Sequence, residues 1–111
     1  MIKQEQTMNE ILGRWRQPQG EIFPGSYMEF HPDGSFNYAY EEMDMHSSGT
    51  YTVGEGTIDL HQTQHTLGLR GTFLGLFSIE GDILTLTLGD PAYPRPESLE
   101  HENKRIYKKV T

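Results

Sequence analysis

Apolar and polar residues alternate along most of this chain, with the period of two that is typical of half-buried β-strands. Met28 and Phe30 alternate with polar neighbours, and Phe36, Tyr38 and Tyr40 continue the pattern. Turns rich in glycine and proline separate the short segments at intervals of about 8–12 residues, which is typical of all-β sandwiches and barrels. The pattern predicts eight short strands, at or around 14–17, 26–31, 36–41, Tyr51, Ile58, 70–79, Leu86 and 104–110.

The simplest arrangement of eight antiparallel strands in chain order is an up-and-down β-barrel, because closure removes both exposed sheet edges. A two-sheet sandwich is the alternative, and the period of two fits both. Before the first strand, Thr7 and Glu10 have the spacing of a capping box and Gly13 is a stop signal, so we expect a short N-terminal helix. The length of 111 residues favours a single domain that spans 1–111.

The charge and composition of the chain exclude several classes of function. Lys and Arg number 9 against 16 Asp and Glu, for a formal net charge of −7, and an acidic body repels nucleic-acid phosphates. There is no cysteine, which excludes disulfides, cysteine-ligated metals and thiol catalysis. We find no apolar run of about 18 residues that predicts a membrane span and no secretory signal. We therefore expect a cytoplasmic protein, although a mature secreted chain would share these features.

The inward-facing stripe of the predicted barrel is rich in aromatic residues and is the main candidate for a binding site. An eight-stranded barrel is just wide enough to be filled by its own side chains or to hold one small ligand. Tyrosine suits a ligand site, because the ring offers apolar area and the hydroxyl can orient a polar group. The sequence leaves both interpretations open. The candidate ligand-binding residues are Met28, Phe36, Tyr38, Tyr40, Tyr51, Phe73, Phe77 and Leu86, with Phe30 in the same stripe.

The segment 70–79 is apolar on both of its strand faces. A solvated strand face is usually polar, so we expect a second surface to cover the outward residues Leu74 and Leu76. That surface is either the N-terminal helix or the same strand of a second copy. In the second case the chain forms a homodimer, to which Leu67 and Leu69 contribute.

Patterns for metal binding and catalysis are weak. His61 and His65 share one face of a predicted strand, but about 13 Å separates their positions, which is too far for two ligands of one ion unless the segment is a loop. His46 lies near the acidic residues of 41–44, which could form a weak site for a hard cation. We find no nucleophile–base spacing and no phosphate-binding glycine loop. We therefore expect no enzyme activity, no metal and no cofactor.

The order and spacing of several short motifs resemble those of the lipocalin and calycin barrels, and in particular the small bacterial lipocalin-like domains. The resemblance covers about residues 10–110 and includes a Gly-x-Trp opening after a short helix. The motifs are Leu12-Gly13-Arg14-Trp15, 30–36 (FHPDGSF), 49–53 (GTYTV), 79–86 (IEGDILTL), and Arg95-Pro96 before a basic last strand.

The resemblance implies a closed barrel with Trp15 packed at one end. It also implies a basic residue of the last strand across the indole, with Arg105 as the best candidate, through a cation–π contact and burial of the arginine stem on the ring. We therefore expect a non-catalytic protein that binds a small hydrophobic or amphipathic molecule. The alternative is a solid barrel that acts as a protein-interaction or inhibitor module through its rim loops, at 18–25, 42–48 and 89–100.

Overall fold

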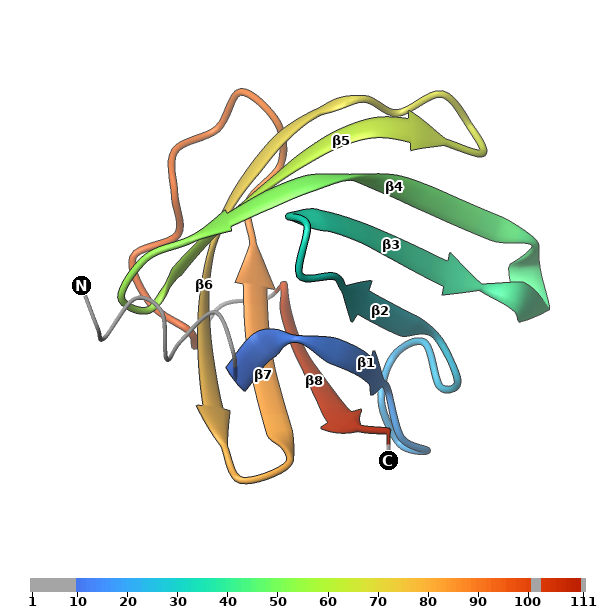
Figure 1. Cartoon of the computed structure of the whole chain (residues 1–111), viewed down its shortest axis with the longest axis vertical. Coiled ribbons are helices and arrows are strands. Elements are labelled where there is room, and N and C mark those ends of the chain that lie inside the picture. Colours follow the sequence, from blue (N-terminus) through green and yellow to red (C-terminus); the bar gives the residue numbers. More distant parts are fainter. Residues whose placement is uncertain (1–9, 101–102, 111) are drawn as a thin grey trace.

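The computed structural model describes residues 10–100 and 103–110 and shows a closed antiparallel β-barrel (Figure 1). In these residues, eight strands are neighbours in chain order, and β8 pairs with β1 to close the sheet. A 3-10 helix, η1 (Glu41–Met43), joins the third strand to the fourth. The strands are β1 (Gly13–Arg16), β2 (Tyr27–Phe30), β3 (Ser35–Tyr40), β4 (Met45–Val53), β5 (Thr57–His65), β6 (Gly71–Glu80), β7 (Ile83–Leu88) and β8 (Lys104–Lys109).

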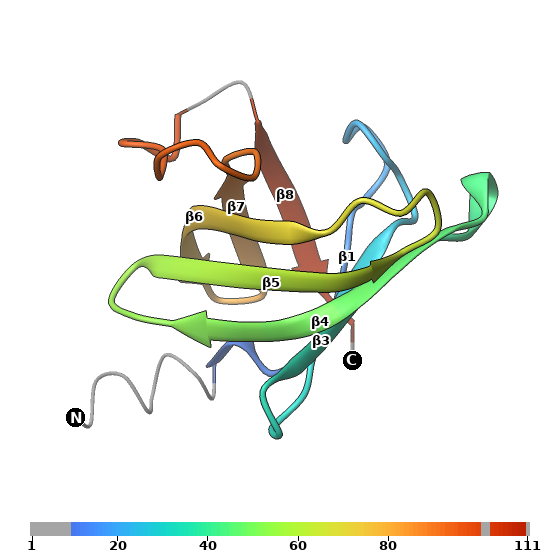
Figure 2. The same cartoon turned by 90° about the horizontal axis from the view of Figure 1, so that it is seen from above.

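The predicted all-β, up-and-down barrel is confirmed, and the chain does not form a two-sheet sandwich. Figure 2 shows the strands wrapping around a common interior. The predicted N-terminal helix is not seen as an element, because residues 1–9 lie outside the described part of the chain. No helix among the described residues is long and apolar enough to cross a membrane.

The two ends of the barrel differ in how the strands are connected. Because consecutive strands are antiparallel, their connections fall alternately at one end and the other. We call the end with short turns the floor and the end with longer loops the mouth. The floor turns are 31–34, 54–56 and 81–82, and the mouth loops are 17–26, 41–44, 66–70 and the described part of 89–103.

The hydrophobic core fills the floor half of the barrel. Trp15 is 1% exposed, and its indole N–H donates a hydrogen bond of 2.8 Å to the carbonyl of Ile11. This bond satisfies the polar atom of a buried ring. The core around Trp15 also contains Phe30, Phe36, Tyr51, Val53, Ile58, Leu84 and Leu86.

The cation over Trp15 is Lys109, and the expectation that Arg105 would lie there is wrong. The Nζ atom of Lys109 is 4.6 Å from the centroid of the indole ring, whereas the guanidinium of Arg105 lies 5.7 Å from the ring centroid of Phe23. The register explains the difference, because Lys109 pairs with Trp15 across the barrel seam while Arg105 pairs with Leu86, nearer the mouth.

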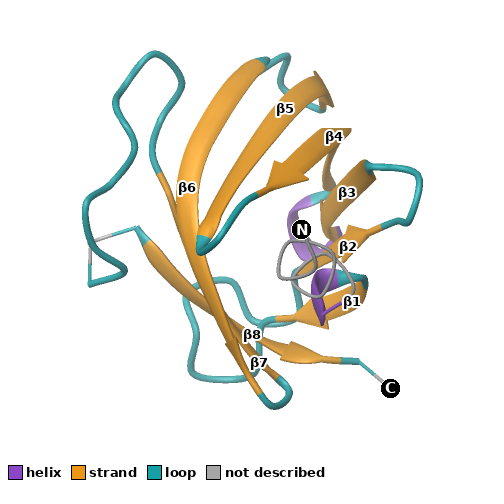
Figure 3. Cartoon of the chain, turned by 60° about the vertical axis from the view of Figure 1, so that its left-hand side comes forward, coloured by secondary structure: helices purple, strands orange, loops and turns teal. Residues whose placement is uncertain are grey.

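The loop between β7 and β8 lies against the outer face of β6 (Figure 3). Arg95 donates a hydrogen bond of 2.8 Å to the carbonyl of Gly75 and forms an ion pair of 2.8 Å with Asp59 on β5. The amide of Gly89 donates to the carbonyl of Leu74 at 2.9 Å. This loop therefore contributes to the cover that we expected over β6. Neither the N-terminal helix nor a homodimer is shown to do so, and the dimer stays a prediction.

Candidate functional site

A cavity of about 290 Å³ lies in the mouth half of the barrel, above the packed core. Its walls come from strands β2 to β8 and from three of the mouth loops. The apolar lining residues are Phe23, Met28, Phe36, Leu60, Leu69, Phe73, Leu86 and Leu88. The polar lining residues are Tyr38, Ser47, Gln62, His65, Asp90, Asn103, Arg105 and Tyr107.

The lining of the cavity changes with depth. Buried apolar side chains such as Met28 and Leu86 lie next to the core, whereas Asp90 and Asn103 belong to the loop at the mouth. The inner end of the cavity is therefore mainly apolar, with Ser47 and Tyr107 as buried polar residues, and its rim carries polar groups beside the apolar Phe23 and Leu69. Ligand pockets commonly combine an apolar lining with a few polar groups that fix the orientation of the ligand.

Five of the eight candidate ligand-binding residues line this cavity, namely Met28, Phe36, Tyr38, Phe73 and Leu86. Tyr51 and Phe77 belong to the packed core instead. The Tyr51 ring meets Phe30 edge-on, with 4.9 Å between centroids, and its hydroxyl donates to the carbonyl of His31 at 3.0 Å.

Tyr40 also does not line the cavity. Its ring packs against Phe23 with 5.5 Å between centroids, and its hydroxyl donates a hydrogen bond of 3.1 Å to a carboxylate oxygen of Glu42. The inward stripe therefore divides by depth. Its floor residues fill the core, its middle residues line the cavity, and Tyr40 supports the mouth loop.

Sequence reasoning missed most of the polar lining. Gln62 follows Ile58 and Leu60 on the inward face of β5, so a polar residue at the mouth end of an apolar stripe was the available signal. On β8, Arg105 and Tyr107 share the inward face with Lys109, which an alternating strand requires. The sequence contains this alternation, but it does not show which of the three residues lies at which depth.

A β-bulge places His65 in the cavity wall. The register between β4 and β5 shifts between Ser48 and Gly49, because Ser48 pairs with Gln64 while Gly49 pairs with Gln62. β5 therefore carries one residue more than β4 at this point. An extra residue of this kind reverses the face of every side chain beyond it on its strand. His61 and His65 therefore do not share one strand face, contrary to the sequence expectation.

The histidines have separate local partners. The Nδ1 atom of His61 lies 3.0 Å from the hydroxyl of Thr72, and His65 Nδ1 accepts a hydrogen bond of 3.0 Å from the amide of Leu67. His46 lies 3.7 Å from Asp44, and both are exposed. In the part of the chain that the structure describes, no three His, Asp or Glu side chains are grouped as a metal ion would require.

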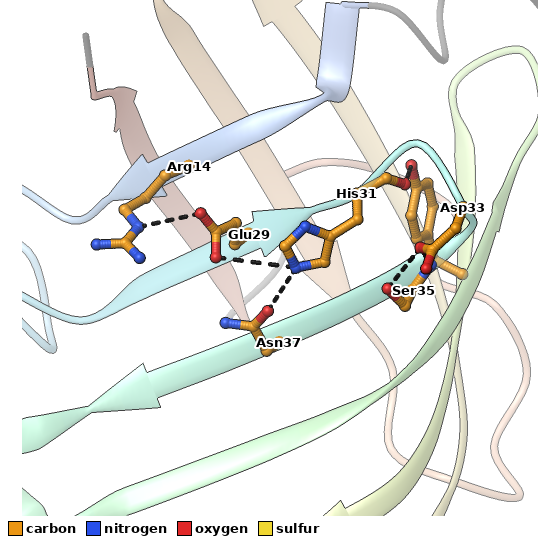
Figure 4. Close-up of polar contacts among 7 residues, drawn as sticks. Arg14, Glu29, His31, Asp33, Ser35 and Asn37 are labelled. Carbon is orange, nitrogen blue, oxygen red and sulfur yellow. Dashed lines mark hydrogen bonds and ion pairs between the residues drawn. The ribbon is translucent and has the colours of Figure 1, made fainter.

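A polar network covers the outer face of β1 to β3, away from the cavity (Figure 4). Glu29 lies between Arg14 at 3.4 Å and His31 at 3.8 Å, and the Nε2 atom of His31 is 2.7 Å from the side-chain oxygen of Asn37. Arg14 and Glu29 pair across β1 and β2, and His31, in the turn after β2, pairs with Asn37 on β3. The network joins three strands on the surface, and we assign it no ligand.

Two buried tyrosines and Arg105 set the electrostatics of the inner part of the cavity, and Asp90 adds a carboxylate at the rim. Burial raises the pKa of the Tyr38 hydroxyl, while hydrogen bonding with Ser26 and the charge of Arg105 act in the opposite direction. Burial also raises the pKa of Tyr107 far above its usual value, and the charge of Arg105 again opposes this shift. Both hydroxyls are therefore neutral hydrogen-bond donors at physiological pH, and both are in the electrostatic field of Arg105.

Comparison with known proteins gives no match. No family model fits the chain, and neither a curated protein nor a solved structure is significantly similar to it.

Proposed function

We propose that this chain is a non-catalytic, lipocalin-like binding protein of the calycin type, similar to the small bacterial lipocalin-like domains and acting in the cytoplasm. The cavity at the mouth of the barrel holds one small hydrophobic or amphipathic molecule. The observation that supports this proposal is the cavity of about 290 Å³, with an apolar inner end and polar groups at its rim.

The two halves of the barrel differ in how their interior is filled. The floor half is filled by its own side chains, including Trp15, Phe30 and Tyr51. In the mouth half, the inward side chains leave space, and apolar groups such as Phe73 and Leu86 face it. Transfer of an apolar ligand surface from water into this space is favourable by about 25 cal/mol per Å². The volume is near the lower end of known ligand pockets, about 300–1,000 Å³, so the ligand is small.

The test uses a neutral fluorescent naphthylamine probe and two neighbouring serines. Ser47 is buried and lines the cavity, whereas Ser48 is on the opposite face of β4. Ser47→Leu fills the cavity from its wall, so we expect probe affinity to fall at least tenfold while the barrel stays folded. Ser48→Leu adds the same volume on the outside and should leave affinity unchanged.

Two results would contradict the proposal. One is a wild-type protein that gives no rise in probe emission at any concentration. The other is a folded Ser47→Leu variant that binds the probe as the wild type does. If neither result occurs, mass spectrometry of small molecules that co-purify with the native protein identifies the ligand class directly.

A second candidate function is a protein-interaction module, and the distribution of exposed apolar residues favours it. Among the described residues, five of the six large hydrophobic side chains that are exposed lie on mouth loops, and the sixth is Val110. The five are Ile22, Met43, Leu67, Leu69 and Tyr93. A rim of this kind suits contact with another protein. Binding of a protein partner would survive Ser47→Leu and would be lost when the rim side chains are made polar.

A homodimer is a third proposal, and one measurement tests it. Leu74 and Leu76 on the outer face of β6 are half-buried by the chain itself, and a second copy would cover them further. Light scattering over a dilution series should then show a mass above that of one chain at high concentration. A mass of 12.7 kDa throughout would contradict the dimer.

A further inference from the structure

We propose that the ligand of the cavity carries a negatively charged head group, such as a carboxylate, and that Arg105 binds this group. The inference rests on the proposed function and narrows the ligand from amphipathic molecules in general to anionic ones. It is carried by the position of Arg105, by its lack of a carboxylate partner among the described residues, and by the hydroxyls beside it.

The position of Arg105 is fixed by its strand. Arg105 pairs with Leu86 on β7 and shares the inward face of β8 with Tyr107, which is 4% exposed. The side chain reaches the cavity between the apolar inner end and the rim. It is the only Arg or Lys among the described residues that lines the cavity. The Arg105 guanidinium therefore lies at the depth where the head group of an inserted amphiphile would lie.

The charge of Arg105 is not neutralised within the part of the chain that the structure describes. Its hydrogen bond of 3.0 Å goes to the carbonyl of Lys104, and no ion pair joins it to a described carboxylate. A guanidinium has five N–H donors, so most of its capacity remains available. Among the described residues, four other cations have a carboxylate within 4.0 Å, namely Arg14 (Glu29), Arg95 (Asp59), Lys104 (Glu100) and Lys108 (Asp82). Arg16, Arg70 and Lys109 share the lack of a described carboxylate partner, but none of them lines the cavity.

Two hydroxyls complete the candidate head-group site. Tyr38 and Tyr107 are close enough to Arg105 for its charge to affect the pKa of each. A phenol is protonated at neutral pH, and burial raises the pKa of both hydroxyls further. The Tyr107 hydroxyl, and the Tyr38 hydroxyl when it turns from Ser26, can therefore donate a hydrogen bond to an anion. Hydrogen bonds between an ionised group and a donor are roughly twice as strong as neutral ones. Arg105 and the two tyrosines therefore form a set of donors, which suits an acceptor-only group such as a carboxylate.

The other titratable groups near the site limit where the anion can lie. Asp90 is an exposed carboxylate on the rim, and Glu21 of the first mouth loop acts weakly on Tyr107. Both repel an anion near the rim, and His65 on the wall attracts one only when it is protonated. The favourable position is therefore deeper, beside Arg105, with the apolar tail towards Phe36 and Phe73.

The experiment compares two probes of equal chain length, decanoate and decanol, by calorimetry at neutral pH. We expect the wild type to bind decanoate ten- to a hundredfold more tightly than decanol, because a hydrogen bond to a charged group is worth about 1.5–3 kcal/mol. Arg105→Gln should remove this preference by weakening decanoate, with little effect on decanol. Arg105→Lys should keep part of it, since it keeps the charge but loses the planar fork.

Lys108→Gln is the matched control, because it makes the same change in charge on the outward face of the same strand. It should bind both probes as the wild type does. Equal affinity of the wild type for decanoate and decanol would overturn this inference and leave the binding function standing. If the wild type binds neither decanoate, nor decanol, nor the naphthylamine, both this inference and the proposed binding function are overturned. If Arg105→Gln does not fold, the affinities of the wild type for decanoate and decanol still decide whether the cavity prefers an anionic ligand.

Discussion

Lys109 of β8 lies over the indole of Trp15 on β1, with its Nζ atom 4.6 Å from the ring centroid. The two residues are direct partners across the seam that closes the barrel, and Lys109 also donates a hydrogen bond to the carbonyl of Leu12. The β1–β8 ladder has only two paired positions among the described residues, Trp15 with Lys109 and Arg16 with Lys108. The Lys109 side chain therefore reinforces a short ladder, at the point where the sheet closes on itself.

Replacing Lys109 with methionine should lower the free energy of unfolding by about 1–2 kcal/mol. The methionine keeps apolar contact with the ring but loses the cation–π contact and the hydrogen bond, each worth about 0.5–1.5 kcal/mol. Urea unfolding followed by the fluorescence of Trp15 measures the change. Lys108→Met is the control, because its ion pair with Asp82 is exposed and long at 4.0 Å. It should change stability by less than about 0.5 kcal/mol, and an equal loss in both variants would contradict the prediction.

The floor of the barrel shows what alternation can and cannot predict. The resemblance to the lipocalin-like barrels implied that Trp15 lies in the interior and that the last strand supplies the cation over its ring. It did not separate Arg105 from Lys109, because residues two or four apart on a strand share one face. The choice depends on the register between β8 and β1, which long-range pairing fixes and local sequence does not.

The lining of the cavity also shows that alternation predicts the face of a residue but not its depth in the barrel. Face assignment correctly grouped Met28, Phe36 and Phe73 on the inward stripe, but depth along the barrel decides whether an inward residue fills the core or lines the space. The position of His65 in the cavity wall was not predicted, for another reason. The bulge beside Gly49 reverses the strand face. An isolated glycine inside a strand segment is the signal for such a bulge, but the alternation of hydrophobic residues does not reveal it.

Gly49 is required by a close approach of two backbones at this bulge. A Cβ atom at this position would lie 1.9 Å from the carbonyl oxygen of His61 on β5. Gly49→Ala should therefore force the strands apart and lower the free energy of unfolding by about 1–3 kcal/mol. Thermal unfolding measures the loss. Thr50→Ala, at the exposed neighbouring position, should stay within about 0.5 kcal/mol of the wild type. A Gly49→Ala variant as stable as Thr50→Ala would show that the strands can yield at this point.

Arg95 holds the β7–β8 loop on the outer face of β6. Its guanidinium joins Asp59 at 2.8 Å and the Gly75 carbonyl at 2.8 Å, and the Asp59 and Arg95 side chains are about two-thirds buried. Arg95→Gln should lower the free energy of unfolding by about 1–2 kcal/mol. The Gly89 amide, which donates to Leu74, should exchange with deuterium at least tenfold faster. Arg70→Gln, at an exposed position, is the charge-matched control and should leave this exchange rate unchanged.

Tyr107 makes the stability of the barrel sensitive to alkaline pH. Burial raises the pKa of its phenol well above the ordinary value of 10.0, so the folded state holds the proton that the unfolded chain releases. Below pH 10 the phenol is neutral in both states, and the stability that it contributes is fully present. Above pH 10 unfolding releases the proton, and the free energy of unfolding falls by about 1.4 kcal/mol per pH unit for each such group.

Tyr107→Phe removes one of these protons without removing the ring. Urea unfolding between pH 9 and pH 11 should therefore show a smaller loss of stability with pH in the variant than in the wild type. Burial raises the pKa of Tyr38 and Tyr51 in the same direction, so a residual slope should remain above pH 10. Tyr93→Phe, on the exposed rim, should retain the wild-type slope. If Tyr107→Phe and Tyr93→Phe lose stability equally steeply, Tyr107 ionises in the folded barrel as it does in the unfolded chain.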